Sequence, residues 1–287
     1  MRKLLCATDL STRAERAVRR AALLARQYSA ELLLLHVVDD DQPKHFVETR
    51  LAEARAHLEA DAARAPGGPE AVAAIEVVAG HASETIARYA HEWNADLLVM
   101  GVHRRRVLLD VFIGTTLERV LRVDRRPVLV VSADDVRPYR RVLLALDTSQ
   151  ASACAVRAAG EFALLDGELA IVHAWEPTYS GQLETAGAVP DTAAAYAENW
   201  SREAQARLQG FLREVGLATL PIEQQIERGP PFDAIRNAVE KRAPQLLVIG
   251  TRGLSGLARV FLGSVAERVL RDVDCDILVV PRPKEGK

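Results

Sequence analysis

The segment RKLLCATDLSTRAERAVRRAALLARQYSAELLLLHVV (residues 2–38) decides the fold, because RRVLLALDTSQASACAVRAAGEFALLDGELAIVHAW (residues 140–175) repeats its plan. Each segment starts with a short apolar run that leads into an Asp-x-Ser. An amphipathic helical pattern follows, and a second apolar run carries a histidine near its end. A supersecondary unit that recurs along a chain indicates a repeat architecture. The sequence therefore predicts two halves with the same fold.

The remainder of each half agrees with this division. The segment 75–101 corresponds to 222–250, and PVLVV (127–131) corresponds to DILVV (276–280). The second half is the longer one, and its extra residues fall within 176–196. Long loops in compact domains are often functional, so this insertion is a candidate lid over a binding site.

The expected strands, such as 32–38, 97–100 and 128–131, are continuous apolar runs, as in parallel strands that are covered on both faces. Between them lie helical patterns, for example at 12–28. Each half therefore predicts a doubly wound, Rossmann-like α/β domain with a five-stranded parallel sheet. The predicted domains are 1–133 and 139–283, joined by the polar linker around Pro138.

Composition excludes several classes of function. The chain has 287 residues, 49% of them hydrophobic, and a formal net charge of −2, so it lacks the basic surplus of a nucleic-acid-binding protein. Its three cysteines are far apart and form no Cys-x-x-Cys pair, which favours the cytoplasm. The apolar stretch 4–7 is too short for a secretory signal, and no run of about 18 apolar residues predicts a membrane span.

The segment GTRGLSGLARVFLGS (250–264) directly follows the apolar run LLVIG and precedes a helical pattern. Glycines let backbone N–H groups approach a phosphate, and the N-terminus of the following helix adds further donors and a positive dipole. Ser264 would cap that helix or donate to a phosphate oxygen. The alternative is that the glycines only make turns. Neither G-x-x-x-x-G-K-[ST] nor G-x-G-x-x-G occurs, so the sequence does not support a P-loop or dinucleotide site.

The spacing G-x-x-G, nine residues, then G-[ST], together with LLALDTS, IVHAW, FLGSV and DILVVP in this order, resembles the universal stress proteins. Both halves, and so nearly the whole chain, look like that fold. The resemblance implies two adenine nucleotide alpha hydrolase-like domains that are related by a pseudo-twofold axis. It also implies an adenine nucleotide, ATP with Mg²⁺, in the second half, with no metal ligands from the protein.

The resemblance assigns roles to particular positions of the second half. Asp147 would hold the adenosine end of the nucleotide with Ala145 beside it, and the backbone of Ala174 would read the adenine edge. The residues that would wrap or contact the ribose and the phosphates are Gly250, Arg252, Gly253, Gly263, Ser264 and Val265. Structural roles stay open for some of these positions. Asp147 or Ser149 could cap the following helix, and His36 and His173 fit hydrogen-bonded core histidines.

The first half departs from the pattern at one position. Its loop has Arg104 where the second glycine should stand, and a side chain there would block the backbone approach or offer a guanidinium to an anion. The run 104–106 could also be an ordinary surface turn. The residues that would form this altered site are Asp9, Val37, Gly101, Arg104, Gly114 and Thr115. We expect nucleotide binding in this half to be lost or changed.

No arrangement typical of hydrolysis or group transfer is evident in the sequence. The resemblance therefore implies an ATP-binding stress and regulatory protein. Two alternatives stay open: an interaction protein with vestigial sites, and a slow magnesium-dependent ATPase. Family members pair through the last strand, so the segments 127–131 and 276–280 are expected to pair within the chain. Association into a homodimer and the identity of a protein partner are left open by the sequence.

Overall fold

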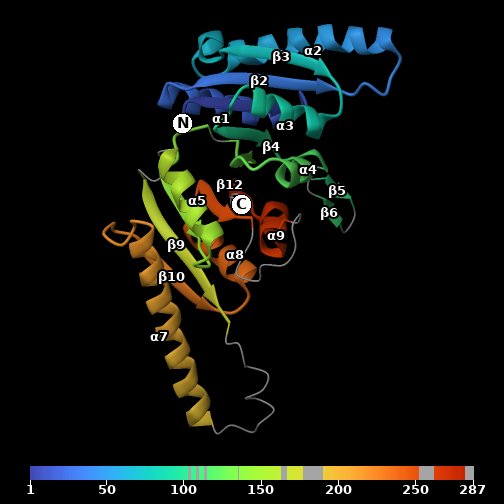
Figure 1. Cartoon of the computed structure of the whole chain (residues 1–287). Coiled ribbons are helices and arrows are strands. Elements are labelled where there is room, and N and C mark those ends of the chain that lie inside the picture. The colour runs from blue at the N-terminus through green and yellow to red at the C-terminus, as the bar shows by residue number, and fades with distance from the viewer. Residues whose placement is uncertain are drawn as a thin grey trace, which may run out of the picture.

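The computed structural model describes residues 1–102, 105–107, 110–112, 115–134, 136–162, 167–176, 190–251 and 262–281. A single ten-stranded sheet runs through the molecule in the order β10-β9-β8-β11-β12-β7-β4-β1-β2-β3 (Figure 1). The strands from the first half are β1 (Lys3–Thr8), β2 (Glu31–Val38), β3 (Ala74–Ala79), β4 (Leu97–Gly101) and β7 (Val128–Val131). The strands from the second half are β8 (Arg141–Ala145), β9 (Glu168–Trp175), β10 (Glu223–Arg228), β11 (Leu246–Gly250) and β12 (Asp276–Val280).

The two halves share one topology. Within each half the five strands are parallel, and the first strand lies between the second and the fourth. The chain therefore reverses its winding direction beside β1 in the first half and beside β8 in the second. This is the predicted doubly wound architecture, and the prediction of the fold is confirmed. Parallel strands of this kind bind ligands outside their carboxyl ends, at the point of reversal.

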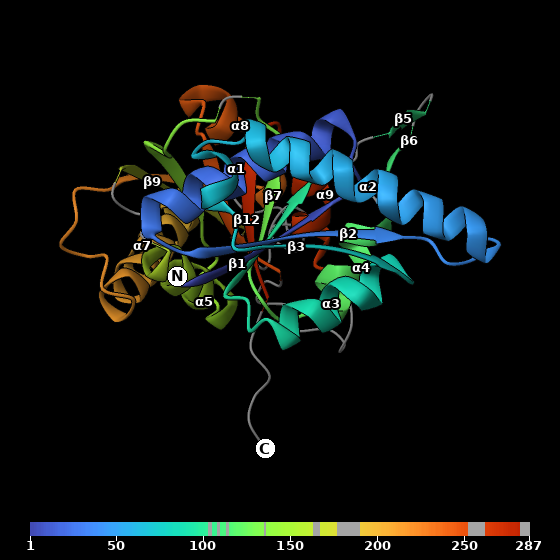
Figure 2. The same cartoon turned by 90° about the horizontal axis from the view of Figure 1, so that it is seen from above.

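Helices cover both faces of the sheet. One apolar core joins it to α1 (Thr12–Tyr28), α2 (Lys44–Arg64), α5 (Gln150–Glu161) and α7 (Pro190–Glu214). The core on the opposite face contains residues of α3 (Ala82–Glu92), α4 (Thr115–Val123), α8 (Pro231–Arg242) and α9 (Ser264–Asp272). Figure 2 shows the first half from above, with β1 to β3 between α1 and α2 on one side and α3 and α4 on the other. A short 3-10 helix, η1 (Gly68–Ala71), follows α2.

Helix α1 illustrates how the sequence specifies these elements. Ser11 caps it, accepting a hydrogen bond from the N–H of Ala14 at 3.2 Å. The predicted apolar stripe faces the sheet, and Ala17, Ala21 and Leu24 are all buried. Small alanines along this stripe let the helix lie close to the strands.

The halves are joined by the strands that the sequence predicted to pair. β7 and β12 lie antiparallel, with Ile277 opposite Val130 and Val279 opposite Val128. This antiparallel pair is what turns two five-stranded sheets into one, and it relates the two halves by a pseudo-twofold rotation. Each half thus covers the edge that the other would expose.

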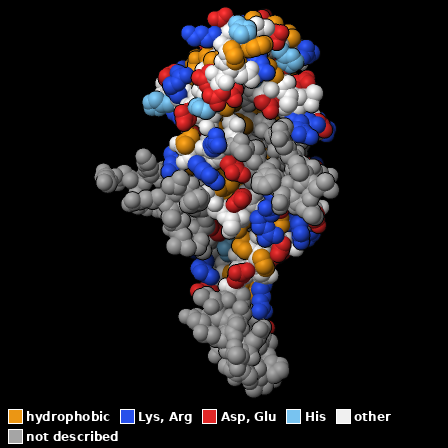
Figure 3. All heavy atoms as spheres, turned by 90° about the vertical axis from the view of Figure 1, so that its right-hand side faces the viewer, with side chains coloured by type: hydrophobic (Ala, Val, Ile, Leu, Met, Phe, Trp, Pro, Cys, Tyr) orange, Lys and Arg blue, Asp and Glu red, His pale blue; other side chains and the backbone are white. Residues whose placement is uncertain are grey.

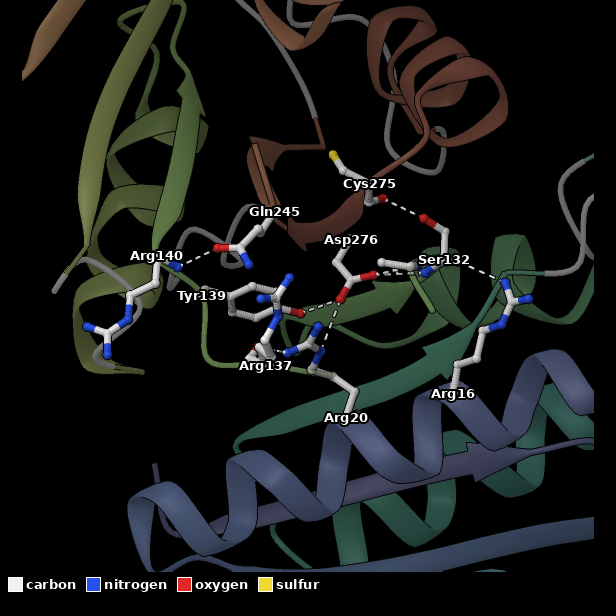
Figure 4. A network of polar contacts seen from close by, with 10 residues as sticks. Arg16, Arg20, Ser132, Arg137, Tyr139, Arg140, Gln245, Cys275 and Asp276 are labelled. Carbon is white, nitrogen blue, oxygen red and sulfur yellow. Dashed lines mark hydrogen bonds and ion pairs between the residues drawn. The ribbon is translucent and has the colours of Figure 1, made fainter. Parts of the chain in front are cut away.

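A buried polar network connects the halves beside this pair (Figure 4). Asp276 is fully buried, and its Oδ1 accepts hydrogen bonds from the N–H groups of Ser132 and Ala133 at 2.9 and 3.0 Å. Its Oδ2 accepts from the hydroxyl of Tyr139 at 2.6 Å and pairs with Nε of Arg20 at 3.1 Å. Helix α1, the linker and β12 are therefore held by one carboxylate.

The linker is held by further contacts to α1. The guanidinium of Arg20 donates to the carbonyl of Arg137 and lies 4.3 Å from the centre of the Tyr139 ring. One turn earlier, Nη1 of Arg16 donates to the carbonyl of Ser132 at 3.0 Å. Burial raises the pKa of Tyr139 well above its usual value, and the negative charge of Asp276 adds to this rise.

Two segments differ from the sequence-based expectation. The loop after β4 contains an antiparallel hairpin of β5 (Arg105–Val107) and β6 (Asp110–Phe112), so Arg105 and Arg106 lie in a strand rather than in a turn. Within the insertion, helix α7 already begins at Pro190, inside the segment that we expected to be loop. The rest of the predicted lid, residues 177–189, lies outside the described residues.

The described part of the chain has no helix long and apolar enough to cross a membrane. On the face of the molecule shown in Figure 3, acidic and basic side chains are interspersed among the coloured atoms.

Candidate functional site

A cavity of about 530 Å³ opens at the carboxyl ends of β8, β9 and β11. It lies where the winding of the second half reverses, between β8 and β11, which is the expected place for a ligand in this architecture. Of the predicted site residues, the cavity is lined by Ala145, Asp147, Ala174, Gly250, Gly263, Ser264 and Val265. The structure thus brings together positions that are more than 100 residues apart in the sequence. The other two, Arg252 and Gly253, lie outside the described residues.

Asp147 stands in the cavity wall shortly after the end of β8. Its Oδ1 accepts a hydrogen bond from the N–H of Ser149 at 3.0 Å and another from the hydroxyl of Ser152 at 2.6 Å. Thr148, which lies between Asp147 and Ser149, has a φ of +62°. The local turn closed by Asp147 and Ser149 stabilises this left-handed conformation. Both hydrogen bonds end on the same carboxylate oxygen, and no hydrogen bond to Oδ2 is seen among the described residues.

The cap of helix α5 is Ser149, whose Oγ accepts from the N–H of Ser152 at 3.3 Å. This resolves one alternative, because Asp147 is not the capping residue. Asp147 lies two residues before the cap, in the cavity wall.

The N-terminus of α9 forms another part of the cavity wall. Its N-cap is Gly263, which has no side chain to satisfy the first N–H groups of the helix, and no other side chain of the described residues does so. The N–H of Gly263 donates to the carbonyl of Thr251 at 2.8 Å. Ser264 is the first helical residue, so the alternative that Ser264 caps the helix is wrong. Free N–H groups and the helix dipole make this part of the wall attractive to an anion.

Gly250 and Gly263 are glycines for different reasons. A Cβ on Gly250 would lie 3.0 Å from the backbone carbon of Ala151, so α5 can approach β11 only because this side chain is absent. Gly263 has φ −64° and ψ 148°, angles that any residue adopts. Packing therefore explains the first glycine, whereas backbone conformation does not require the second.

The middle of the cavity is largely apolar. The apolar residues in its wall include Ala145, Val172, Ala174, Ile235 and Ile249. His173 also lines it, and its Nδ1 lies 2.7 Å from the carbonyl oxygen of Leu146. Because a carbonyl only accepts, this nitrogen carries the proton. His36 makes the matching contact to Thr8 at 2.8 Å in the first half, so the prediction of hydrogen-bonded histidines is confirmed.

Sequence reasoning missed several residues of the wall, among them Trp175 and Arg207. Trp175 directly follows Ala174, so an aromatic beside the predicted adenine contact was a usable signal. Arg207 is an exposed residue of α7. It had no such signal, because the sequence alone does not show which face of that helix reaches the carboxyl ends of the strands.

The first half holds a different cavity, of about 390 Å³, at the carboxyl end of β2. Asp9 and Val37 of the predicted altered site line it, together with charged residues of α2: Arg50, Glu53 and His57. Gly101 ends β4, Thr115 begins α4, and neither is part of this lining. Arg104 and Gly114 lie outside the described residues.

A cluster of three potential metal ligands occurs once among the described residues, at Asp39, Asp40 and Asp41. All three are exposed and follow β2 of the first half, away from the cavity beside Asp147. The described wall of that cavity thus brings no such trio together.

Comparisons with known proteins agree on one family. The model of the Universal stress protein family matches residues 1–132 and again 138–281. A universal stress protein of Mycolicibacterium smegmatis is 27% identical over 304 residues, which cover 98% of this chain and 97% of that protein. A shorter match, 38% identical over 84 residues, to a universal stress protein of Methanocaldococcus jannaschii covers 29% of this chain. This match spans 48% of the relative, so the chain aligns with about half of its length.

Among solved structures, that of a universal stress protein from Archaeoglobus fulgidus superposes over 98% of both chains with a TM-score of 0.68. Its sequence is 21% identical, so the likeness concerns the fold. It extends over both halves of the chain.

Proposed function

Because the chain belongs to the universal stress protein family, whose model matches both of its halves, we propose that its second half binds ATP in the cavity beside Asp147. The chain then acts as a nucleotide-binding regulatory protein rather than as a fast hydrolase. The uncapped N-terminus of α9 carries this proposal, since it faces the same cavity as Asp147.

Two parts of the cavity wall differ in the charge that they favour. At the N-terminus of α9, the N–H groups of Ser264 and Val265 and the helix dipole attract phosphate oxygens. The carboxylate of Asp147 repels phosphate and accepts hydrogen bonds from hydroxyl or amino groups. A nucleotide carries both phosphates and such donors, so its polar groups suit both parts of the wall. The apolar part of the wall suits a purine ring, and Trp175 offers an aromatic face for stacking.

The cavity volume of about 530 Å³ lies within the range of small-molecule sites. Gly263 adds support, because its backbone conformation would admit any residue. A glycine there leaves the first N–H groups of α9 open to close approach by a ligand. Magnesium would enter with the phosphates, as it commonly does in nucleotide sites.

The first half would serve as a scaffold or as a second sensor. Its cavity by β2 is lined by charged side chains of α2 and differs from that of the second half. The cytoplasm is the proposed location, because the three cysteines are buried and form no disulfide, as suits a reducing compartment.

The test is isothermal titration of the full chain with ATP and magnesium. Ser264→Asp places a negative charge at the first position of α9, where it favours the helix but repels phosphate. Gln150→Asp adds the same charge at the first position of α5, and Gln150 is exposed and outside the cavity lining. We expect Ser264→Asp to weaken ATP binding by more than about tenfold, or roughly 1.4 kcal/mol, and Gln150→Asp to leave it nearly unchanged.

No binding by the unmodified chain would instead favour an interaction protein with vestigial sites. Equal losses in the two variants would contradict the placement of the phosphates at α9. Magnesium-dependent phosphate release that Ser264→Asp abolishes would assign a slow ATPase to the same cavity.

A further inference from the structure

Ser152 distinguishes the two halves at the point where each carries its aspartate. Its side chain is buried, and its hydroxyl donates to Oδ1 of Asp147 at 2.6 Å while accepting from the N–H of Asp147 at 3.0 Å. The helix cap identifies the equivalent residue, because the N–H of Ser152 donates to Ser149 as the N–H of Ala14 donates to Ser11. Ala14 has a methyl group in place of this hydroxyl and can make neither bond.

The hydroxyl of Ser152 therefore bonds to Asp147 twice, once to its backbone N–H and once to its carboxylate. Together with the N–H of Ser149, the hydroxyl gives Oδ1 two donors on the protein side. A carboxylate held in this way has one orientation, so Oδ2 is preset before a ligand arrives. Presetting an acceptor reduces the ordering cost of binding. In the first half, the turn donor is retained, as the N–H of Ser11 donates to Asp9 at 3.0 Å, but the hydroxyl is missing.

A carboxylate oxygen only accepts, so its partner on ATP must be a donor. The donors of ATP are the adenine amino group and the ribose hydroxyls. Asp147 directly follows β8, whereas the apolar wall suited to the base is formed by Val172 and Ala174 of β9 and Ile235 of α8. The ribose is therefore the part of the nucleotide that this carboxylate would meet.

We propose that Ser152 is a positioning residue that presets Asp147 to accept a hydrogen bond from a ribose hydroxyl, which makes the second half selective for ribonucleotides. This inference rests on the proposed nucleotide site. It also gives a second reason, besides the glycine loop, for the two halves to differ in nucleotide binding. The first half has Ala14 at this position and so lacks the serine hydroxyl that holds Asp147.

The experiment is a double-mutant cycle in the full chain, with ATP, 2′-deoxy-ATP and 3′-deoxy-ATP as probes in isothermal titration. Ser152→Ala should weaken ATP binding by about tenfold, the order of one well-placed hydrogen bond to a charged group. It should weaken binding less for the deoxynucleotide that lacks the contacted hydroxyl, so discrimination falls. In the Asp147→Ala background, Ser152→Ala should change affinity by less than about twofold, because the two residues act as a unit.

Ser149→Ala is the matched control, since it removes a serine hydroxyl from the same helix end but leaves the contact between Ser152 and Asp147. It should preserve the discrimination between ATP and the deoxynucleotides. Melting temperatures of all variants show that each is folded.

Each outcome decides between the claims. If the unmodified chain does not bind ATP, the proposed function fails and this inference fails with it. If it binds ATP but Ser152→Ala keeps both affinity and discrimination, only the inference is overturned. A loss that persists in the Asp147→Ala background would assign Ser152 a general structural role and would also overturn it.

Discussion

Nε of Arg20 lies 3.1 Å from Oδ2 of Asp276, and the two side chains are only 2% and 0% exposed. The pair joins α1 of the first half to β12 of the second (Figure 4). It lies beside the seam, the antiparallel pair of β7 and β12 where the two halves of the sheet meet. A buried ion pair costs desolvation energy on forming, but removing one partner leaves the other charge uncompensated. The seam therefore depends on both residues being present.

Asp276→Asn is expected to lower the free energy of unfolding by about 3 to 5 kcal/mol, because it leaves Arg20 as an unpaired buried charge. Urea denaturation at neutral pH, followed by circular dichroism, measures this. Asp134→Asn is the control, since Asp134 pairs with Arg16 while 79% exposed. That substitution should cost less than about 1 kcal/mol. Similar losses in the two variants would contradict the importance of the buried pair.

Tyr139 predicts a loss of stability at alkaline pH. Burial, with Asp276 second, raises its pKa in the folded chain well above the usual 10.0. The folded state therefore favours the neutral phenol, and this contribution is complete below pH 10. Above pH 10 the unfolded chain loses the proton first, so the free energy of unfolding should fall by about 1.4 kcal/mol per pH unit until the folded tyrosine ionises.

Tyr139→Phe removes this ionisable group, and the comparison isolates it from the other tyrosines. Denaturation curves between pH 9 and 11 should show a steeper decline for the unmodified chain than for the variant. Parallel declines would mean that the phenol of Tyr139 ionises as readily in the folded chain as in water.

Glycine-to-alanine substitutions should have opposite effects at two positions. In Gly250→Ala, the new methyl group would lie 3.0 Å from atoms of Ala151, and we expect a loss of about 1 to 3 kcal/mol. Gly210 lies inside α7, and a Cβ there would lie 4.0 Å from Nη2 of Arg213. Gly210→Ala should therefore stabilise the chain by about 0.5 to 1 kcal/mol through helix propensity. Thermal unfolding of both variants provides the measurement.

Tryptophan fluorescence should report on the cavity. The chain has three tryptophans, and Trp175 lines the cavity of the second half. A base that stacks on Trp175 should change its emission, so ATP should alter the fluorescence of the unmodified chain and of Trp93→Phe. Trp175→Phe should lose most of the response. A response that survives in Trp175→Phe would place the nucleotide elsewhere.

The fold was predictable because its signals are local and repeated. Continuous apolar runs such as 32–38 can only be strands covered on both faces, and the recurrence of the unit gave two independent versions of each element. The hairpin of β5 and β6 was missed because two three-residue strands carry almost no periodicity. The start of α7 at Pro190 was missed because proline at the beginning of a helix looks, in sequence, like a turn.

The site was predictable where residues follow strand ends and motif spacing, as for Asp147, Ala174 and Gly263. Arg207 was not, because the face of α7 that reaches the cavity depends on packing. The role of Ser152 was equally hidden. Its position in the helix is evident from the sequence, but its two bonds to Asp147 depend on the left-handed turn at Thr148.

The antiparallel pair of β7 and β12 has a consequence for how the two sites can differ. In a dimer of identical subunits, any substitution occurs in both copies at once. Here the partner across the seam is always the other half of the same polypeptide, supplied at the millimolar effective concentration of a short tether. The chain is in effect a permanent heterodimer of fixed one-to-one composition. A substitution in one half therefore leaves the corresponding position of the other half unchanged.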